Sequence, residues 1–298
     1  MKIQVRVPAS TANLGTGVDC LGIALSKYLT VVFESCNELE IIFKRGFEHD
    51  IPLEKNLVLS GARRVFELVG KTFPEMRITM ETDIPASRGL GSSACALVAG
   101  VFGANAWLGN PLGVDELIEA ATEIEGHPDN IVPCAVGGFT VAMGVNGKVF
   151  YHRIPLDSHL KFVAAIPDYE LSTKLARSVV PKEFPLSAVI SQVQRACFLV
   201  AGLTSGELKN MDIASDDIVF TPARKALIPG YERVTESALH SGALCSMISG
   251  AGPAIIALAF DNTSEIALAM ERGFATADIN SCAHILDADN SGAVVTVL

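Results

Sequence analysis

The segment PASRGLGSSA at residues 85–94 constrains the fold of this chain more than any other stretch. Residues 76–81 before it alternate between polar and apolar, which predicts a strand with one buried face. Residues 92–108 after it are mostly small and apolar, which predicts a buried helix. Gly89 and Gly91 allow positive φ and a close approach of the backbone to a ligand. A strand, a glycine turn and a helix N-terminus present several backbone N–H groups together, and such a place binds phosphate.

Other glycine motifs fit this segment poorly. The Walker A pattern fails because no Gly-Lys-Ser/Thr ends the loop. The dinucleotide pattern matches formally as Gly89-x-Gly91-x-x-Ala94, but it needs a fully buried parallel strand before it and an acidic strand end after it. The preceding strand alternates instead, and the acidic residues at a suitable distance, Asp115 and Glu116, begin a predicted helix. The partner motifs of protein kinases are absent, and a tight turn with a serine cap is the plain structural alternative.

Composition limits the class of protein and its partners. The 298 residues are 49% hydrophobic and 19% charged, which indicates a compact globular protein. A net charge of -10 argues against a nucleic acid or an anionic membrane surface as partner. Seven scattered cysteines without a CxxC pair predict reduced thiols. We expect no signal peptide and no membrane span, and therefore a soluble cytoplasmic protein.

The predicted elements indicate an α+β fold, because strands and helices do not alternate regularly. Asn146-Gly147 predicts a hairpin turn between strands. A break near residues 155–159 predicts a boundary between an N-terminal domain, residues 1–157, and a C-terminal domain, residues 158–298. Strands are predicted at residues 2–7, 24–33, 39–43, 76–81, 136–144, 148–154, 162–166, 246–249, 254–260, 283–286 and 293–298. Helices are predicted at residues 56–69, 92–108, 115–125, 188–203 and 264–273.

Two further glycine-containing segments become informative when they are considered together with the central segment. PASTANLGTGVDCLG at residues 8–22 predicts a polar loop after the first strand, and ISGAGPA at residues 248–254 predicts a glycine turn between strands. In this order the three segments resemble the motifs of the kinase superfamily named for galactokinase, homoserine kinase, mevalonate kinase and phosphomevalonate kinase, the GHMP kinases. The resemblance spans nearly the whole chain. It implies a two-domain α+β fold, with a ribosomal-protein-S5-domain-2-like N-terminal domain, a ferredoxin-like C-terminal domain, and ATP with Mg²⁺ in the cleft between them.

The same resemblance implies which residues bind the nucleotide. The central loop would hold the triphosphate, and the C-terminal glycine turn would help to close over it. Ser93 and Glu123 would hold Mg²⁺, which prefers oxygen ligands, and Glu125 remains an alternative to Glu123. The implied nucleotide-binding residues are Asn56, Pro85, Ala86, Ser87, Arg88, Gly89, Leu90, Gly91, Ser92, Ser93, Ala94, Cys95, Gly250 and Gly252.

Three other segments, at residues 123–139, 171–177 and 221–231, resemble homoserine kinases within that superfamily. This resemblance implies ATP-dependent phosphorylation of the hydroxyl of L-homoserine to O-phospho-L-homoserine, a step in threonine biosynthesis. An amino-acid zwitterion needs an anion for its ammonium and guanidinium groups for its carboxylate. By resemblance the substrate-binding residues are Asn13, Asp19, His127, Asp129, Asn130, Arg177 and Arg224.

The mechanism expected from the sequence uses no dedicated base. Several members of the superfamily have an aspartate where this chain has Asn130, and an amide cannot accept a proton at neutral pH. We therefore expect Asn13 and Asn130 to orient the acceptor hydroxyl, which loses its proton late to a phosphate oxygen or to water. Asp19 is the alternative base. The predicted catalytic residues are Asn13, Ser93, Glu123 and Asn130.

Two other functions stay open at this level. A sibling GHMP kinase for a mevalonate-type or sugar acceptor would need no clamp for an amino-acid carboxylate. A non-catalytic ligand-binding member would keep the fold without the transfer reaction. A homodimer is expected by resemblance alone.

Overall fold

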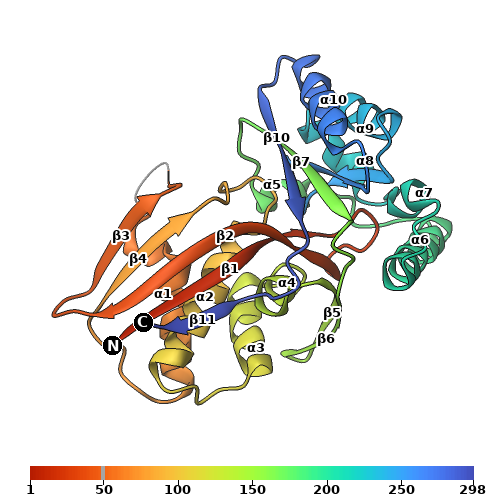
Figure 1. Ribbon diagram of the computed structural model, residues 1–298. Helices are drawn as coiled ribbons and strands as arrows, with labels where there is room; N and C mark the ends of the chain where they lie inside the picture. Colours follow the sequence, from red (N-terminus) through yellow and green to blue (C-terminus); the bar gives the residue numbers. More distant parts are fainter. Residues whose placement is uncertain (48–50) are drawn as a thin grey trace.

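The structure is a computed structural model that describes residues 1–47 and 51–298, and Figure 1 shows it as two sheets with helices packed on them. Within the described residues the first sheet runs β11-β1-β2-β4-β3, and β5 and β6 extend it beside β2. Four helices, α1 to α4, pack on this sheet or on one another. The strands are β1 (Lys2–Ala12), β2 (Leu21–Ser35), β3 (Glu40–Arg45), β4 (Met76–Thr82), β5 (Phe139–Val145), β6 (Lys148–Ile154) and β11 (Val294–Val297). The helices are α1 (Leu57–Leu68), α2 (Ser92–Trp107), α3 (Val114–Glu125) and α4 (Ile131–Val136).

The second sheet is antiparallel and runs β10-β7-β9-β8. Helices α9 and α10 cover it, while the chain between β7 and α9 forms four further helices. The strands are β7 (Lys161–Pro167), β8 (Cys245–Ile248), β9 (Ile255–Ala259) and β10 (Ser281–Asp287). The helices are α5 (Thr173–Ser178), α6 (Leu186–Ser205), α7 (Met211–Ser215), α8 (Thr221–Arg224), α9 (Tyr231–His240) and α10 (Thr263–Ala275).

The last strand crosses back to the first sheet. In Figure 1 β11 lies beside β1, close to both termini, and Ile3 pairs with Val297. The break near residues 155–159 coincides with the change from the first sheet to the second, because β6 ends before it and β7 begins after it. The division between residues 157 and 158 stays a prediction, although the C-terminal residues lie in the first sheet.

The mixed α and β architecture and most long elements agree with the expectations. The prediction of a loop over residues 8–22 is partly wrong, because β1 continues to Ala12 and β2 begins at Leu21. Ser10 and Thr11 are fully buried within this strand, and their hydroxyls are satisfied by Asn130 and Ser249. Polar residues survive inside a buried strand only with such partners. Helices α4, α5, α7, α8 and α9 were not among the predicted elements.

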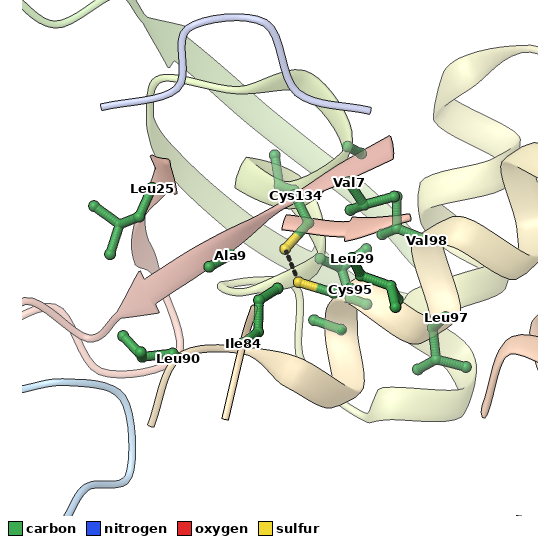
Figure 2. Packing of buried hydrophobic residues seen from close by; sticks show 14 of the residues in the cluster. Val7, Ala9, Leu25, Leu29, Ile84, Leu90, Cys95, Leu97, Val98 and Cys134 are labelled. Atoms are coloured by element: carbon green, nitrogen blue, oxygen red, sulfur yellow. Dashed lines mark hydrogen bonds between the residues drawn. The ribbon is translucent and has the colours of Figure 1, made fainter. Parts of the chain in front are cut away.

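The glycine segment rests on a packed apolar layer, shown in Figure 2. The side chain of Leu90 is only 1% exposed. It belongs to the same buried cluster as Ile84 and the apolar residues in the first turns of α2. The sulfur atoms of Cys95 and Cys134 lie 3.5 Å apart without a disulfide, and all seven cysteines are free. Burial raises the pKa of Cys95 well above its ordinary value, so this thiol acts as a small apolar side chain. The reduced state of the thiols stays a prediction.

One helix differs from the expectation that no segment could span a membrane. Among the described helices, α6 is long and apolar enough to span a membrane by length and composition, and 22% of its apolar stretch is buried in the protein. Helices of soluble proteins pass the same test, so this finding is weak evidence for a membrane. The shorter apolar helix α2 is buried, as predicted.

The two sheets meet at the glycine segment. Ser249 Oγ donates to the carbonyl oxygen of Gly89 at 2.7 Å and is hydrogen-bonded to Thr11 Oγ1 at 2.9 Å. The backbone N–H of Gly250 donates to Ala12 O at 3.1 Å. The side chain of Arg88 ties the segment to the end of β7, since its Nε donates to Pro167 O at 3.3 Å. Three segments far apart in sequence therefore form one contact.

Replacing Gly89 by alanine should weaken this contact. Gly89 has φ +82°, and a β carbon there would lie 2.2 Å from Ser249 O, a backbone atom that cannot easily move. Gly109 has φ +84° with nothing within 4 Å of its β carbon, so Gly109→Ala isolates the cost of positive φ, about 1 kcal/mol. We expect Gly89→Ala to cost about 1–3 kcal/mol more than Gly109→Ala in the free energy of unfolding, measured with urea. Equal losses would show that the close approach carries no cost.

Candidate active site

Two adjoining cavities lie along the junction between the sheets. The larger has a volume of about 1090 Å³ and the smaller about 240 Å³. They share the lining residues Ser87, Ser92 and Ser93, which belong to the glycine segment and the first turn of α2. The segment predicted to hold phosphate therefore stands where the two cavities meet.

The larger cavity is lined by apolar residues and by about as many polar or charged ones. Binding sites for organic ligands combine the two kinds of group. Its walls come from both sheets, for example Met80 on β4 and His284 on β10. Burial lowers the pKa of His284 and of Lys27 from their ordinary values. Asn56 lines this cavity, where its Oδ1 caps α1 by accepting from Leu59 N at 3.0 Å. The predicted residues that line it are Asn56, Pro85, Ala86, Ser87, Arg88, Ser92, Ser93 and Cys95.

The N-terminus of α2 opens toward the shared wall. Gly91 is its N-cap with φ +67°, and no side chain caps it. A β carbon at this position would lie 2.1 Å from Ser10 Oγ and 3.0 Å from Asn130 Oδ1. Glycine therefore lets the loop pass close to the first strand while the first N–H groups of α2 remain available to an anion.

Several predicted nucleotide-binding residues occupy other places. The side chains of Leu90 and Ala94 are buried in the apolar layer and line neither cavity. Gly250 and Gly252 line the smaller cavity rather than the larger one. The prediction included Leu90 and Ala94 because it covered every residue of the motif. In a segment that packs on the core, however, some side chains face the core instead of the ligand.

The two glutamates of α3 that were considered as metal ligands have different partners. Ser93 Oγ donates to Glu125 Oε1 at 2.6 Å, and both residues line the smaller cavity. Glu123 instead accepts from Arg64 Nε at 3.1 Å and Nη2 at 2.8 Å, and its side chain is 62% exposed. Residues two apart on a helix lie on opposite sides, so only one of these carboxylates can face the loop. The oxygen pair of Ser93 and Glu125 fits a hard cation such as Mg²⁺.

The smaller cavity holds compensating charges. Arg177 binds Asp19 through two hydrogen bonds, of 2.6 and 3.1 Å, and the hydrogen bond to Asp19 is the main cause that raises the pKa of Arg177. His127 Nδ1 contacts Asp129 Oδ1, and this hydrogen bond raises the pKa of His127 above its ordinary value. Ligand atoms of Asp19, His127 and Asp129 lie within 4.8 Å of one another. Because Arg177 already balances Asp19, we assign no metal to this cluster.

Arg224 lines this cavity without an ion-pair partner among the described residues. It is 6% exposed, its Nε has no hydrogen-bond partner, and no ion pair involves it among the described residues. Its guanidinium carbon lies 5.5 Å from the centre of the Phe220 ring. Burial is the main cause that lowers the pKa of Arg224. A buried donor without a partner is costly, and an anionic ligand in the cavity would satisfy it.

Two asparagines are held rigidly at the mouth of this cavity. Asn13 has φ +70°, donates from Nδ2 to Gly250 O at 2.7 Å and accepts from Asp19 N at 3.0 Å. Asn130 Oδ1 accepts from Ser10 Oγ at 2.8 Å. Positive φ at a non-glycine residue is uncommon and clusters at functional sites. All seven predicted substrate-binding residues line this one cavity: Asn13, Asp19, His127, Asp129, Asn130, Arg177 and Arg224.

Some residues of the site were not predicted. Ser10, Thr11 and Ser249 lie beneath it and hold Asn130 and the glycine segment in place. All three belong to the glycine-containing clusters at residues 8–22 and 248–254. A serine or threonine next to apolar strand residues was the sequence signal that could have identified them. Ser172, the N-cap of α5, lines the smaller cavity.

Comparison with known proteins places both parts of the chain in one family. The family model of the GHMP kinases N terminal domain matches residues 56–138. The model of the GHMP kinases C terminal part matches residues 204–276. The expected α+β GHMP fold is therefore confirmed.

Relatives match over nearly the whole length. The homoserine kinase of Carboxydothermus hydrogenoformans is 42% identical over 86% of this chain and 85% of its own length, and that of Persephonella marina is 39% identical over 99% of both. The crystal structure of homoserine kinase from Cytophaga hutchinsonii has a TM-score of 0.88 at 32% identity, covering 99% of this chain and 97% of that chain. L. major mevalonate kinase in complex with R-mevalonate has a TM-score of 0.72 at 14% identity over 96% of both chains, which shows likeness of fold alone. The chain belongs to the GHMP kinases and, within them, to the homoserine kinase family.

Proposed function

We propose that this protein transfers the γ-phosphoryl group of ATP to the hydroxyl of L-homoserine and forms O-phospho-L-homoserine in threonine biosynthesis. The observation that carries the proposal is the meeting of two cavities at Ser92 and Ser93. One cavity, of about 1090 Å³, is large enough for a nucleotide, and the other, of about 240 Å³, suits a small charged acceptor. Donor and acceptor would thus meet at the N-terminus of α2.

The residues around α2 fit a nucleotide with Mg²⁺. Open N–H groups of the first turn and the positive end of the helix favour a phosphate chain. Ser93 and Glu125 would supply oxygen ligands to the metal, with phosphate oxygens and water completing its shell. The bound metal supplies neutralisation of phosphate charge. Asn56, at the far wall of the larger cavity, would contact the base.

The smaller cavity fits an amino-acid zwitterion. Arg224 offers donors that are unpaired among the described residues, and Arg177 presents a second guanidinium beside it. A carboxylate placed between them would satisfy Arg224 and compete with Asp19 for Arg177. Asp19, released from that pair, would then accept the ammonium. His127 and Asp129 line the same wall.

The chemistry needs positioning more than a base. Asn130 Oδ1 accepts from Ser10 Oγ, and its Nδ2 donates to Asp129 Oδ1 at 3.4 Å, so the second N–H of the amide would be the donor to the acceptor hydroxyl. Asn13 is likewise fixed by Gly250 and Asp19. These amides would hold the acceptor hydroxyl in line with the γ-phosphorus, and its proton would leave late to a phosphate oxygen or to water.

We further propose that the enzyme is cytoplasmic and has two domains divided near residues 155–159. The last strand, β11, returns to the sheet of the first domain. The net charge of -10 disfavours nucleic acid and anionic membranes as partners.

The proposed reaction can be tested by ADP release with homoserine, mevalonate, phosphomevalonate and shikimate as acceptors. We expect turnover with homoserine alone, and loss of it in the double variant Arg177→Ala/Arg224→Ala. Loss should reach at least about 100-fold in kcat/KM, since two charged hydrogen-bonding partners are removed. Activity with mevalonate that survives the double variant would favour a sibling kinase. ATP binding without transfer to any acceptor would favour a non-catalytic member.

The two glutamates of α3 allow a matched test of the metal site. Glu125→Gln should raise the Mg²⁺ concentration needed for half-maximal activity and lower kcat by about 100-fold, because a ligand carboxylate is lost. Glu123→Gln, which removes the same charge from the exposed Arg64 pair, should leave both quantities within about twofold. The reverse pattern would return the metal to Glu123.

We also propose a homodimer through α6. Leu186, Ile190, Val193 and Cys197 recur at helical spacing on its exposed side. The one charged residue of this helix, Arg195, is paired with Asp216 away from this stripe. Since each copy carries a net charge of -10, an uncharged apolar stripe is the surface on which two copies can meet without repulsion.

Val193→Glu should convert the dimer to a monomer in size-exclusion chromatography with light scattering, because it places two like charges in the interface. Met143→Glu is the matched control: Met143 is 57% exposed on β5 and Val193 is 56% exposed. The control should stay dimeric. A wild-type monomer, or a Val193→Glu dimer, would rule out this interface.

A further inference from the structure

A buried aspartate organises the segment that carries Arg224. Asp217 is 5% exposed and lies between α7 and α8. Its carboxylate accepts hydrogen bonds from the backbone N–H groups of Val219 at 2.9 Å, Phe220 at 3.0 Å and Thr221 at 2.6 Å. The hydroxyl of Thr221 donates to it as well, at 2.9 Å. These hydrogen bonds fix the start of α8, the helix that ends at Arg224.

Gln192 of α6 connects this aspartate to the loop that follows β1. Its Nε2 donates to Asp217 Oδ1 at 2.8 Å and to the carbonyl oxygen of Thr16 at 3.2 Å. Its Oε1 accepts from Ile218 N at 3.3 Å. Gln192 is itself 8% exposed, so its polar groups depend on these partners. The loop that follows β1 is thereby tied to the segment that precedes α8.

The loop and this segment also touch directly. Thr16 Oγ1 donates to Ala214 O at 3.0 Å, and a β carbon on Gly15 would lie 1.9 Å from Ser215 O. That loop carries Asn13 and Asp19. The spacing between Asp19 on one wall and Arg224 on the other is therefore set by buried contacts outside the cavity.

Asp217 also balances the charge of Arg224 without accepting a hydrogen bond from its guanidinium group. No ion pair joins the two side chains within the described part of the chain, and the carboxylate is fully used by Gln192 and by the start of α8. Burial opposes the charge of the guanidinium, and the nearby negative charge of Asp217 favours it. The guanidinium N–H groups therefore remain available for a ligand.

We infer that Asp217, with Gln192, is a positioning residue for Arg224 and sets the affinity of the cavity for the carboxylate of the acceptor. This inference rests on the proposed function. It differs from a general structural role in what loss of the charge alone would change. The link to the loop that carries Asp19 runs through Gln192 and Asp217 Oδ1, which an amide oxygen can replace. The balance of charge at Arg224 needs the anion, so loss of the charge should act on the carboxylate end of the acceptor.

The test compares Asp217→Asn with Asp216→Asn in the full-length enzyme. Asp216 is the adjacent residue, but its side chain is 63% exposed and paired with Arg195 at the surface. We expect Asp217→Asn to raise the KM for homoserine by about tenfold, with the KM for ATP and kcat within about threefold of wild type. Asp216→Asn should change none of these values by more than about twofold.

Two analogues separate the ends of the acceptor. 4-Hydroxybutyrate keeps the carboxylate and lacks the ammonium, and 3-amino-1-propanol keeps the ammonium and lacks the carboxylate. As competitive inhibitors against homoserine, the first should bind about tenfold more weakly to Asp217→Asn and the second should bind unchanged. Equal weakening of both analogues, or of neither, would overturn the inference.

Thr221→Val decides the question if Asp217→Asn does not fold. This variant keeps the charge of Asp217 and the shape of residue 221 but removes one donor to the carboxylate. It should raise the inhibition constant of 4-hydroxybutyrate alone, by about threefold. An unchanged constant would contradict the positioning role. A wild-type enzyme that does not turn over homoserine would refute the proposed function itself, and the inference would fall with it.

Discussion

The contact between the glycine segment and the turn at Ser249 is the interaction on which the rest of the site depends. Ser249 is fully buried, and its hydroxyl bonds to Gly89 of the central segment and to Thr11 of the first strand. The larger cavity has walls from both sheets, so its shape depends on how the two sheets meet. A single buried hydroxyl between three segments thus fixes the distance across which donor and acceptor meet, and glycine at position 89 is what lets the backbones come that close.

Local charge, rather than the charge of the whole chain, suits this site to anions. The protein carries a net charge of -10, which would slow a polyanion at long range. Inside the smaller cavity Arg177 and Arg224 stand beside Asp19 and Asp129, and only Arg224 lacks a direct partner among the described residues. A ligand with both charges leaves every one of these groups paired, whereas a simple anion would leave Asp19 exposed. That asymmetry favours a zwitterion.

The sequence predicted motifs better than orientations. Alternation over residues 76–81, the small residues of α2 and Asn146-Gly147 each report a local preference, and those elements were predicted correctly. The choice between Glu123 and Glu125 depends on which side of α3 faces Ser93, a residue on another helix, so no local pattern could decide it. The sequence of α3 shows which side of the helix is apolar, but it does not show that the glycine segment lies opposite the other side. The buried side chains of Leu90 and Ala94 show the same limit, since a motif does not tell which side chains point into the core.

The same limit shapes the catalytic part of the site. Asn130 could be recognised as a residue unable to act as a base, yet only the structure reveals that Ser10 occupies its amide oxygen and that Gly91 must lack a side chain for this contact. Strand β1, the glycine segment and α4 are therefore locked around one amide. An enzyme without a base at this position has to gain rate from orientation, and orientation requires amides that cannot rotate. In the proposed reaction, the partners of Asn13 and Asn130 would contribute by holding the two amides in place.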